Sequence, residues 1–205
     1  IAPIRKVLIH TPGSEHNYTL PKNTTEWVAD ESGQLIHNPD YLLFDDIISP
    51  SGMAAEHNEL ENVLPAFTGK DHTYQFNDIL VDTLQTPAQR QELYSACSTL
   101  DQKLYGMENS VDTQKILDLE APDFAAVLLS GRITNPVLET VFKWPLPNLI
   151  FTRDIAVTLN NTLVLTWGRW PARQREMLLM KHVAHPHPLF SNFTQFDFHT
   201  ICPDL

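Results

Sequence analysis

The chain has 205 residues, 42% of them hydrophobic and 19% charged, a composition that excludes disorder as the overall state. Its formal net charge of −11 disfavours nucleic acid and anionic membrane surfaces as partners, because both repel an acidic protein. No apolar run approaches the roughly 20 residues of a membrane-spanning helix, and the first residues lack the order of a signal peptide, so we expect a cytoplasmic protein.

The N-terminal third predicts a strand, an acidic loop and a helix. Residues 5–10 form a short apolar run closed by a Thr-Pro-Gly turn, which is typical of a buried strand. After a polar stretch, the apolar residues 41–44 lead directly into Asp45 and Asp46, which places two carboxylates at the lip of an apolar element. A helix is then predicted from Ser51-Gly52, and its apolar residues fall near one face: Met53, Leu60, Val63 and Leu64.

The character of the chain becomes helical between about residues 76 and 142. Thr86, Pro87 and Gln89 combine an N-cap, a proline at the first helical position and a capping-box glutamine, and apolar residues follow at helical spacing. They predict one long helix that ends near Gly106. Shorter helices are predicted at residues 112–119, 122–130 and 136–142.

The C-terminal third returns to β structure and ends in another helix. Two runs rich in β-branched residues, 155–159 and 162–167, are joined by Asn160-Asn161. Asparagine tolerates positive φ, so this pattern predicts a hairpin. A helix is predicted to begin at Pro171.

Residues 147–154 hold the most informative polar cluster. Asn148, Phe151, Arg153 and Asp154 bring together an amide, an aromatic ring, a cation and a carboxylate at the entry to the predicted hairpin. Polar groups placed there need a partner, because burying them unpaired is unfavourable. That partner is either structural, as in a turn at Arg153 and Asp154 with Asn148 capping a loop, or it is a ligand.

Three stretches are similar to the N-terminal signatures of the arginine deiminase family. They read Leu-Leu-Phe-Asp-Asp at 42–46, Pro-Leu-Pro-Asn-Leu-Ile-Phe-Thr-Arg-Asp at 145–154 and Trp-Pro-Ala-Arg-Gln-Arg-Glu at 170–176. Glu56-His57 also resembles that family's pattern. The order of the three stretches and the helical block between them match as well. The resemblance extends loosely over nearly the whole chain, and it is most specific at residues 145–154.

The resemblance implies an α/β fold of the pentein type, in which five αβ modules surround a pseudo-fivefold axis. This chain would then form a partial propeller of about two modules with an inserted helical bundle. The expected parts are a first module with the Leu-Phe-Asp-Asp loop at 1–75, the helical insertion at 76–142 and a second, incomplete module at 143–205.

The resemblance also implies hydrolysis of L-arginine to L-citrulline and ammonia, without a metal or cofactor. In the family a cysteine thiolate attacks the guanidinium carbon, a histidine moves protons and two acids bind the guanidinium nitrogens. Carried over to this chain, Asp154 is the catalytic carboxylate that binds the guanidinium, and Asn148 and Phe151 line the pocket. Arg173 pairs with the substrate α-carboxylate, and Asp46 lies in a loop that borders the site.

Two neighbouring arginines are not assigned to the substrate. We expect Arg153 to neutralise nearby acids, and Arg175 to be a solvated helix cation paired with Glu176 or another acid.

The family's later acidic residue, its catalytic histidine and its cysteine in a glycine-rich loop have no counterpart here, and the seven glycines do not cluster. We therefore expect a truncated, N-terminal part of such an enzyme that is inactive by itself. Its uncovered strand-rich face favours self-association, so a homo-oligomer is expected.

Other interpretations of the reactive side chains are weaker. Cys202 lies close to the last residue without a glycine elbow, unlike a fixed and activated nucleophile. Cys97 fits a small core residue. The histidines at 182, 185 and 187 are interrupted by prolines and do not share a helical face, so surface histidines are expected rather than a metal site.

Two alternative functions stay open. Beside the arginine deiminase interpretation, one alternative is a non-catalytic binding or assembly protein that retains this half-fold, and the other is a related amidinotransferase or agmatine-type deiminase. Such relatives share the fold but generally lack the helical block.

Overall fold

The computed structural model describes residues 3–107, 111–134 and 136–201. Within those ranges the chain is a mixed α/β structure of helices and small sheets, without a closed barrel. None of the described helices is long and apolar enough to cross a membrane. The predicted α/β class is therefore confirmed at this level.

The predicted first strand is present as β1 (Val7–Ile9). It pairs in parallel with β4 (Thr73–Gln75), and the connection between the two strands contains α1 (Pro50–Val63) and α2 (Pro65–Thr68). Helix α1 begins where the sequence predicts, with the Ser49 hydroxyl accepting a hydrogen bond from a first-turn N–H. No residue of α1 is buried, and its apolar residues Leu60 and Val63 are exposed.

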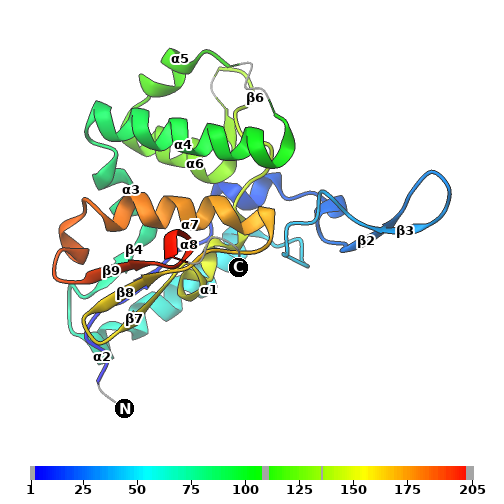
Figure 1. Ribbon diagram of the computed structural model, residues 1–205. Helices are drawn as coiled ribbons and strands as arrows, with labels where there is room; N and C mark the ends of the chain where they lie inside the picture. The colour runs from blue at the N-terminus through cyan, green and yellow to red at the C-terminus, as the bar shows by residue number, and fades with distance from the viewer. Residues whose placement is uncertain (1–2, 108–110, 135, 202–205) are drawn as a thin grey trace.

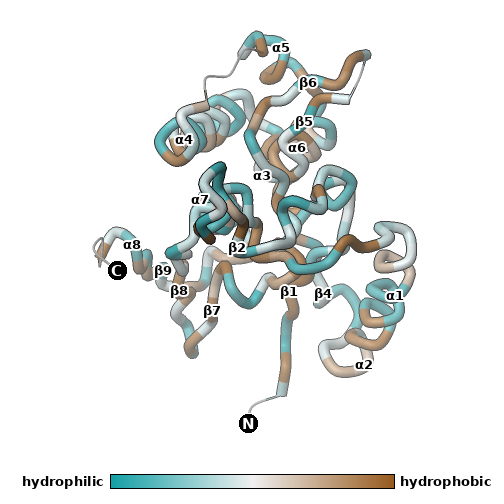
Figure 2. The backbone as a smooth tube through the Cα atoms, turned by 90° about the vertical axis from the view of Figure 1, so that its right-hand side faces the viewer, coloured by the Kyte–Doolittle hydropathy of each residue, from teal (hydrophilic) through white to brown (hydrophobic). Residues whose placement is uncertain are grey.

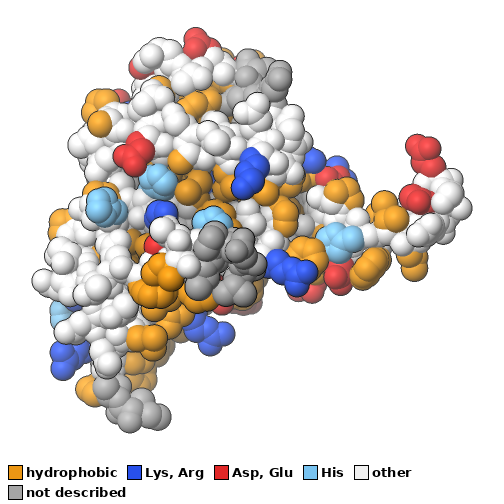
Figure 3. Space-filling model, viewed as in Figure 1, with side chains coloured by type: hydrophobic (Ala, Val, Ile, Leu, Met, Phe, Trp, Pro, Cys, Tyr) orange, Lys and Arg blue, Asp and Glu red, His pale blue; other side chains and the backbone are white. Residues whose placement is uncertain are grey.

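An antiparallel hairpin that the sequence analysis did not predict projects from the body of the molecule (Figure 1). It consists of β2 (Trp27–Ala29) and β3 (Leu35–His37). Its turn is held by the Asp30 carboxylate, which accepts hydrogen bonds from two backbone N–H groups. Figure 3 shows hydrophobic side chains along this arm, in agreement with the exposure of Trp27 and Leu35.

The central helices follow the predicted caps closely. The chain continues from α3 (Phe76–Thr83) into α4 (Pro87–Tyr105). In α4 the Thr86 hydroxyl accepts a hydrogen bond from the Gln89 N–H, and Gly106 closes the helix with φ of 63°. The next two predicted helices are α5 (Thr113–Leu117) and α6 (Ala121–Ser130).

The helix predicted at residues 136–142 is wrong. This segment contains strand β6 (Glu139–Thr140), which pairs antiparallel with β5 (Arg132–Ile133). Gly131 turns the chain at the end of α6 with φ of 74°, and its carbonyl accepts hydrogen bonds from the N–H groups of Val141 and Phe142. These two hydrogen bonds use the backbone N–H groups of Val141 and Phe142 and hold the chain against the turn. The same N–H groups are therefore not available for a helix.

The predicted C-terminal hairpin is confirmed as β7 (Ala156–Leu159) and β8 (Thr162–Leu165), with Asn160 at φ of 54°. Strand β9 (Thr194–Asp197) adds in parallel to β8. The crossover between them is α7 (Pro171–Ala184), and α8 (Phe198–Ile201) follows β9. Short 3-10 turns complete the described elements: Ser14–Tyr18, Pro21–Asn23, Pro147–Ile150, Thr152–Asp154 and Pro188–Phe190.

Figures 1 and 2 both place α4, α5, α6 and the β5–β6 pair at one end of the molecule and the larger sheet at the other, with α7 between them. One continuous hydrophobic core joins these parts. Cys97 is completely buried in that core, as the sequence predicts, and burial raises the pKa of its thiol to about 12.

Arg175 of α7 is buried, so the prediction of a solvated helix cation is wrong, whereas the predicted pairing with an acid other than Glu176 is confirmed. Its side chain is buried, with Nη1 3.5 Å from Asp101 Oδ1 of α4 and Nη2 donating to the Trp144 carbonyl. The guanidinium also lies 4.6 Å from the centre of the Phe142 ring. Arg175 therefore ties α7 to α4 through contacts that are shielded from water.

Candidate functional site

Asp154, Arg173 and Glu176 form one connected charge cluster between the turn at 152–154 and the first turns of α7. Nη1 of Arg173 lies 3.1 Å from Asp154 Oδ2, and its Nε lies 2.6 Å from Glu176 Oε2. Its Nη2 donates to the carbonyl oxygen of Asn148 at 3.4 Å. The structure thus brings these three residues together. Two of them, Asp154 and Arg173, are predicted site residues.

Local structure explains why these side chains meet. Pro171 occupies the first turn of α7, so Arg173 and Glu176, three residues apart, lie on the same side of the helix. Asp154 ends a 3-10 turn just before β7. Its N–H donates to the Phe151 carbonyl, and its own carbonyl accepts from the Thr166 hydroxyl. The backbone of Asp154 is therefore fixed on both sides of its side chain.

Exposure falls steeply across the cluster. The side chain of Asp154 is 42% exposed, that of Arg173 is 12% exposed and that of Glu176 is fully buried. Burial raises the pKa of Glu176 to about 7, against the attraction of Arg173 and Arg175. The solvent side of the cluster is therefore a carboxylate that a cation can reach, and the inner side is a carboxylate that no solute reaches.

Asn148 is buried, and its amide nitrogen donates to the Leu42 carbonyl. It therefore holds the segment that precedes the two acids, which is the loop-capping role that the sequence left open. Phe151, the other predicted pocket residue, is half-exposed on the same turn as Asp154. Both residues lie within the same short stretch as Asp154, and only Phe151 presents its side chain to solvent.

The two acids after residue 44 differ in their surroundings. The Tyr41 hydroxyl donates to Asp45 Oδ1 at 2.6 Å, which raises the pKa of Tyr41 to about 12. Asp46 is exposed and has no hydrogen bond or ion pair with another described residue. Between the buried side chains of Leu42 and Phe44, Leu43 has φ of 57°, so this backbone is strained. Of these two acids, Asp45 is therefore paired and Asp46 has a carboxylate without a partner among the described residues.

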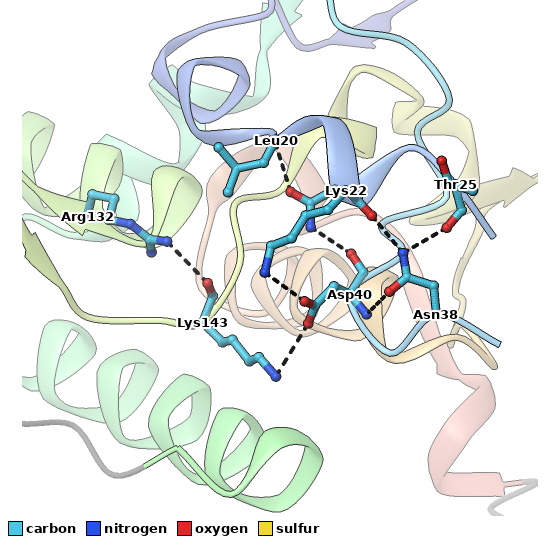
Figure 4. Close-up of polar contacts among 8 residues, drawn as sticks. Leu20, Lys22, Thr25, Asn38, Asp40, Arg132 and Lys143 are labelled. Atoms are coloured by element: carbon cyan, nitrogen blue, oxygen red, sulfur yellow. Dashed lines mark hydrogen bonds and ion pairs between the residues drawn. The ribbon is translucent and has the colours of Figure 1, made fainter. Parts of the chain in front are cut away.

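Figure 4 shows how the base of this loop is fixed. The Asn38 amide donates to the carbonyl oxygens of Lys22 and Thr25. Asp40 accepts from Lys22 Nζ at 2.7 Å, and its second carboxylate oxygen lies 3.7 Å from Lys143 Nζ. The segment that leads into Asp45 and Asp46 is therefore anchored at Asn38 and Asp40.

Arg153 does not neutralise nearby acids, contrary to expectation. Its side chain is exposed, and none of the ion pairs among the described residues involves it. In this turn the side chain of Asp154 points to Arg173 of α7 instead.

The other reactive side chains lie elsewhere. His182 is on the last turn of α7 and not in a loop, whereas His185 and His187 follow the helix. Within the described ranges, no three His, Cys, Asp or Glu side chains are arranged to hold a metal ion. A polar depression of about 380 Å³ is lined by His10, Glu15 and Gln75, among others. Cys202 lies outside the described residues.

Two contributing residues were missed by the sequence analysis. Glu176 was considered only as a partner for Arg175, although its spacing of three from Arg173 on a predicted helix already indicates a pair. Tyr41 was assigned only to an apolar run, and its spacing to Asp45 gave no signal because the segment is not helical.

A family model described as arginine deiminase matches residues 40–202. The matched range contains the acidic loop, the turn with Asp154 and the helix with Arg173 and Glu176. It begins after the β2–β3 arm and leaves β1 outside.

Proposed function

This chain belongs to the arginine deiminase family, and on that premise we propose that it binds L-arginine in the reaction that hydrolyses L-arginine to L-citrulline and ammonia. Asp154 is the carboxylate that receives the guanidinium. Arg173 is the cation that receives the α-carboxylate. No cofactor or metal is needed in this proposal, because the charges of the two ends of the ligand are matched by side chains.

The observation that carries the proposal is the ion pair of Asp154 and Arg173 at the surface end of the cluster. A carboxylate binds a planar guanidinium through charge-assisted hydrogen bonds, and a guanidinium binds a carboxylate in the same way. L-arginine carries both groups. It can therefore exchange one internal ion pair for two new ones, in which its guanidinium faces Asp154 and its carboxylate faces Arg173.

The remaining predicted residues act around this pair in the proposal. Asp46 offers a free carboxylate from the acidic loop to a cationic ligand. Phe151 covers the aliphatic part of the ligand from its half-exposed position. Asn148 acts indirectly, because it holds the acidic loop at Leu42.

We also propose the family's architecture for this chain. Residues 1–75 and 143–205 would correspond to pentein modules of the α/β-propeller, the second incomplete, with residues 76–142 as the helical insertion. The two parallel pairings, β1 with β4 and β8 with β9, each with a helical connection, support this assignment.

Cys97, the cysteine within the described ranges, does not have the properties of an activated nucleophile. Cys97 is fully buried, and its raised pKa leaves the thiol protonated near neutral pH. This observation also favours a second candidate function, a guanidino-acid-binding protein without catalysis. An agmatine-type specificity fits less well, because agmatine has no carboxylate for Arg173.

We expect the 205-residue chain to bind L-arginine without converting it. Isothermal titration calorimetry should detect binding of L-arginine. L-citrulline should bind more weakly, because it lacks the positive charge that Asp154 receives. A colorimetric citrulline assay should stay at the level of buffer. Turnover that is lost in Cys202→Ser would overturn the inactive-chain proposal, and equal affinity for the two amino acids would contradict the guanidinium assignment.

A further inference from the structure

Glu176 is the most deeply buried charge of the cluster. Its side chain is fully buried, and its Oε2 accepts from Arg173 Nε at 2.6 Å. Removing a carboxylate from water is unfavourable unless a partner compensates for the lost solvation. The partner of Glu176 is the Nε of Arg173.

The contacts of Arg173 divide its guanidinium into an inner and an outer edge. The inner edge, Nε, faces Glu176, whereas Nη1 faces the partly exposed carboxylate of Asp154. A ligand carboxylate can replace Asp154 at the outer edge, because water reaches that side. It cannot replace Glu176. The contact of Arg173 with Glu176 therefore persists when a ligand carboxylate replaces Asp154.

Among the described residues, the hydrogen bond and ion pair of Glu176 are made with Arg173 and with no other segment. Its other oxygen, Oε1, is buried without a hydrogen-bond partner among the described residues. The neighbouring Arg175, in contrast, joins α7 to α4 through its ion pair with Asp101. The carboxylate of Glu176 is thus committed to Arg173.

We infer that Glu176 is a positioning residue of the binding site, which holds the Nε edge of Arg173 so that the outer edge of the guanidinium faces the ligand carboxylate. This inference rests on the proposed function for its ligand. The contact between Glu176 and Arg173 can be tested separately from the ligand.

Glu176→Gln keeps the size of the side chain and removes its charge. We expect the Nε–H proton of Arg173, observed by ¹H–¹⁵N NMR, to exchange with water about tenfold faster in this variant, because a neutral acceptor binds it less strongly. The matched control is Glu92→Gln, the same change at an exposed glutamate of α4, which should leave this proton unchanged. An unchanged Arg173 signal in folded Glu176→Gln would overturn the inference.

Ligand affinity separates positioning from general damage to the site. Glu176→Gln should lower the affinity for L-arginine about tenfold, because Arg173 no longer presents its outer edge to the ligand carboxylate. Agmatine, which has no carboxylate, should not bind more weakly to the variant than to the parent. Equal weakening of both ligands would show a merely structural role. If the parent binds neither ligand, the proposed function fails, and the Nε–H measurement still decides the contact.

A titration of the parent covers the case in which Glu176→Gln does not fold. The charged groups around Glu176 are Arg173 and Arg175 of α7 and Asp154 of the facing turn. We expect the ¹³Cδ signal of Glu176 and the Nε–H signal of Arg173 to shift together with one midpoint near pH 7. Protonation of Glu176 at lower pH weakens the contact, so exchange of the Nε–H should be faster there than base-catalysed exchange alone predicts. Independent midpoints would overturn the inference.

Discussion

Asp154→Asn should nearly abolish binding of L-arginine by this chain. The substitution keeps the shape of the side chain and removes the charge that receives the guanidinium. Asp154 is 42% exposed, so the loss is smaller than for a fully buried partner. Hydrogen bonds to charged groups contribute about 1.5 to 3 kcal/mol, and a loss at the upper end of that range weakens binding roughly a hundredfold.

Calorimetry on the parent and two variants checks this result. Arg153→Gln is the control, because Arg153 is the exposed neighbour of Asp154 and has no ion pair with the described residues. Its affinity for L-arginine should equal that of the parent. An affinity of Asp154→Asn within about threefold of the parent, a difference under 1 kcal/mol, would show that residue 154 does not receive the guanidinium.

Arg175→Met should have the largest effect on stability. It removes the buried cation that faces Asp101 and the donor to the Trp144 carbonyl. Breaking a buried pair by removing one partner leaves an uncompensated charge and typically lowers the free energy of unfolding by about 3 to 5 kcal/mol. The contact joins α4 to α7, so we expect the whole transition to move and not one end of the molecule alone.

Urea unfolding followed by circular dichroism measures the change. The control Arg169→Met makes the same substitution at an exposed arginine and should alter the free energy of unfolding by less than about 0.5 kcal/mol. A loss below about 1 kcal/mol in Arg175→Met would mean that the Lys143 N–H, which also donates to Asp101, or water compensates the carboxylate, and that the ion pair of Arg175 with Asp101 does not stabilise the fold.

The elements that the sequence predicts best are those whose ends are fixed by local chemistry. Thr86 and Gly106 close α4 at both ends, and the asparagine at 160 turns the β7–β8 hairpin. The segment after Gly131 was predicted incorrectly, because backbone bonds to that glycine decide its course. Arg175 was misplaced for a similar reason. Its partner Asp101 lies 74 residues away, and helical periodicity alone does not reveal that a facing helix covers it.

In the candidate site, too, the sequence indicates the residues but not their long-range contacts. The resemblance placed Asp154 and Arg173 in one site, but their mutual ion pair depends on how the turn at 152–154 packs against α7. Asn148 was predicted to line a pocket, and its hydrogen bond to Leu42 follows from a contact across 106 positions. Residue types and spacing therefore indicate which side chains matter, whereas the division between ligand contact and support requires the packed structure.

A crystal structure of the 205-residue chain with L-arginine would show directly whether Asp154 and Arg173 bind the two ends of the ligand. We expect the ligand guanidinium within hydrogen-bond distance of the Asp154 carboxylate, the ligand carboxylate at the outer edge of Arg173, and the contact of Arg173 with Glu176 retained. A ligand bound elsewhere, with Arg173 still paired to Asp154 as in the unliganded chain, would overturn this assignment.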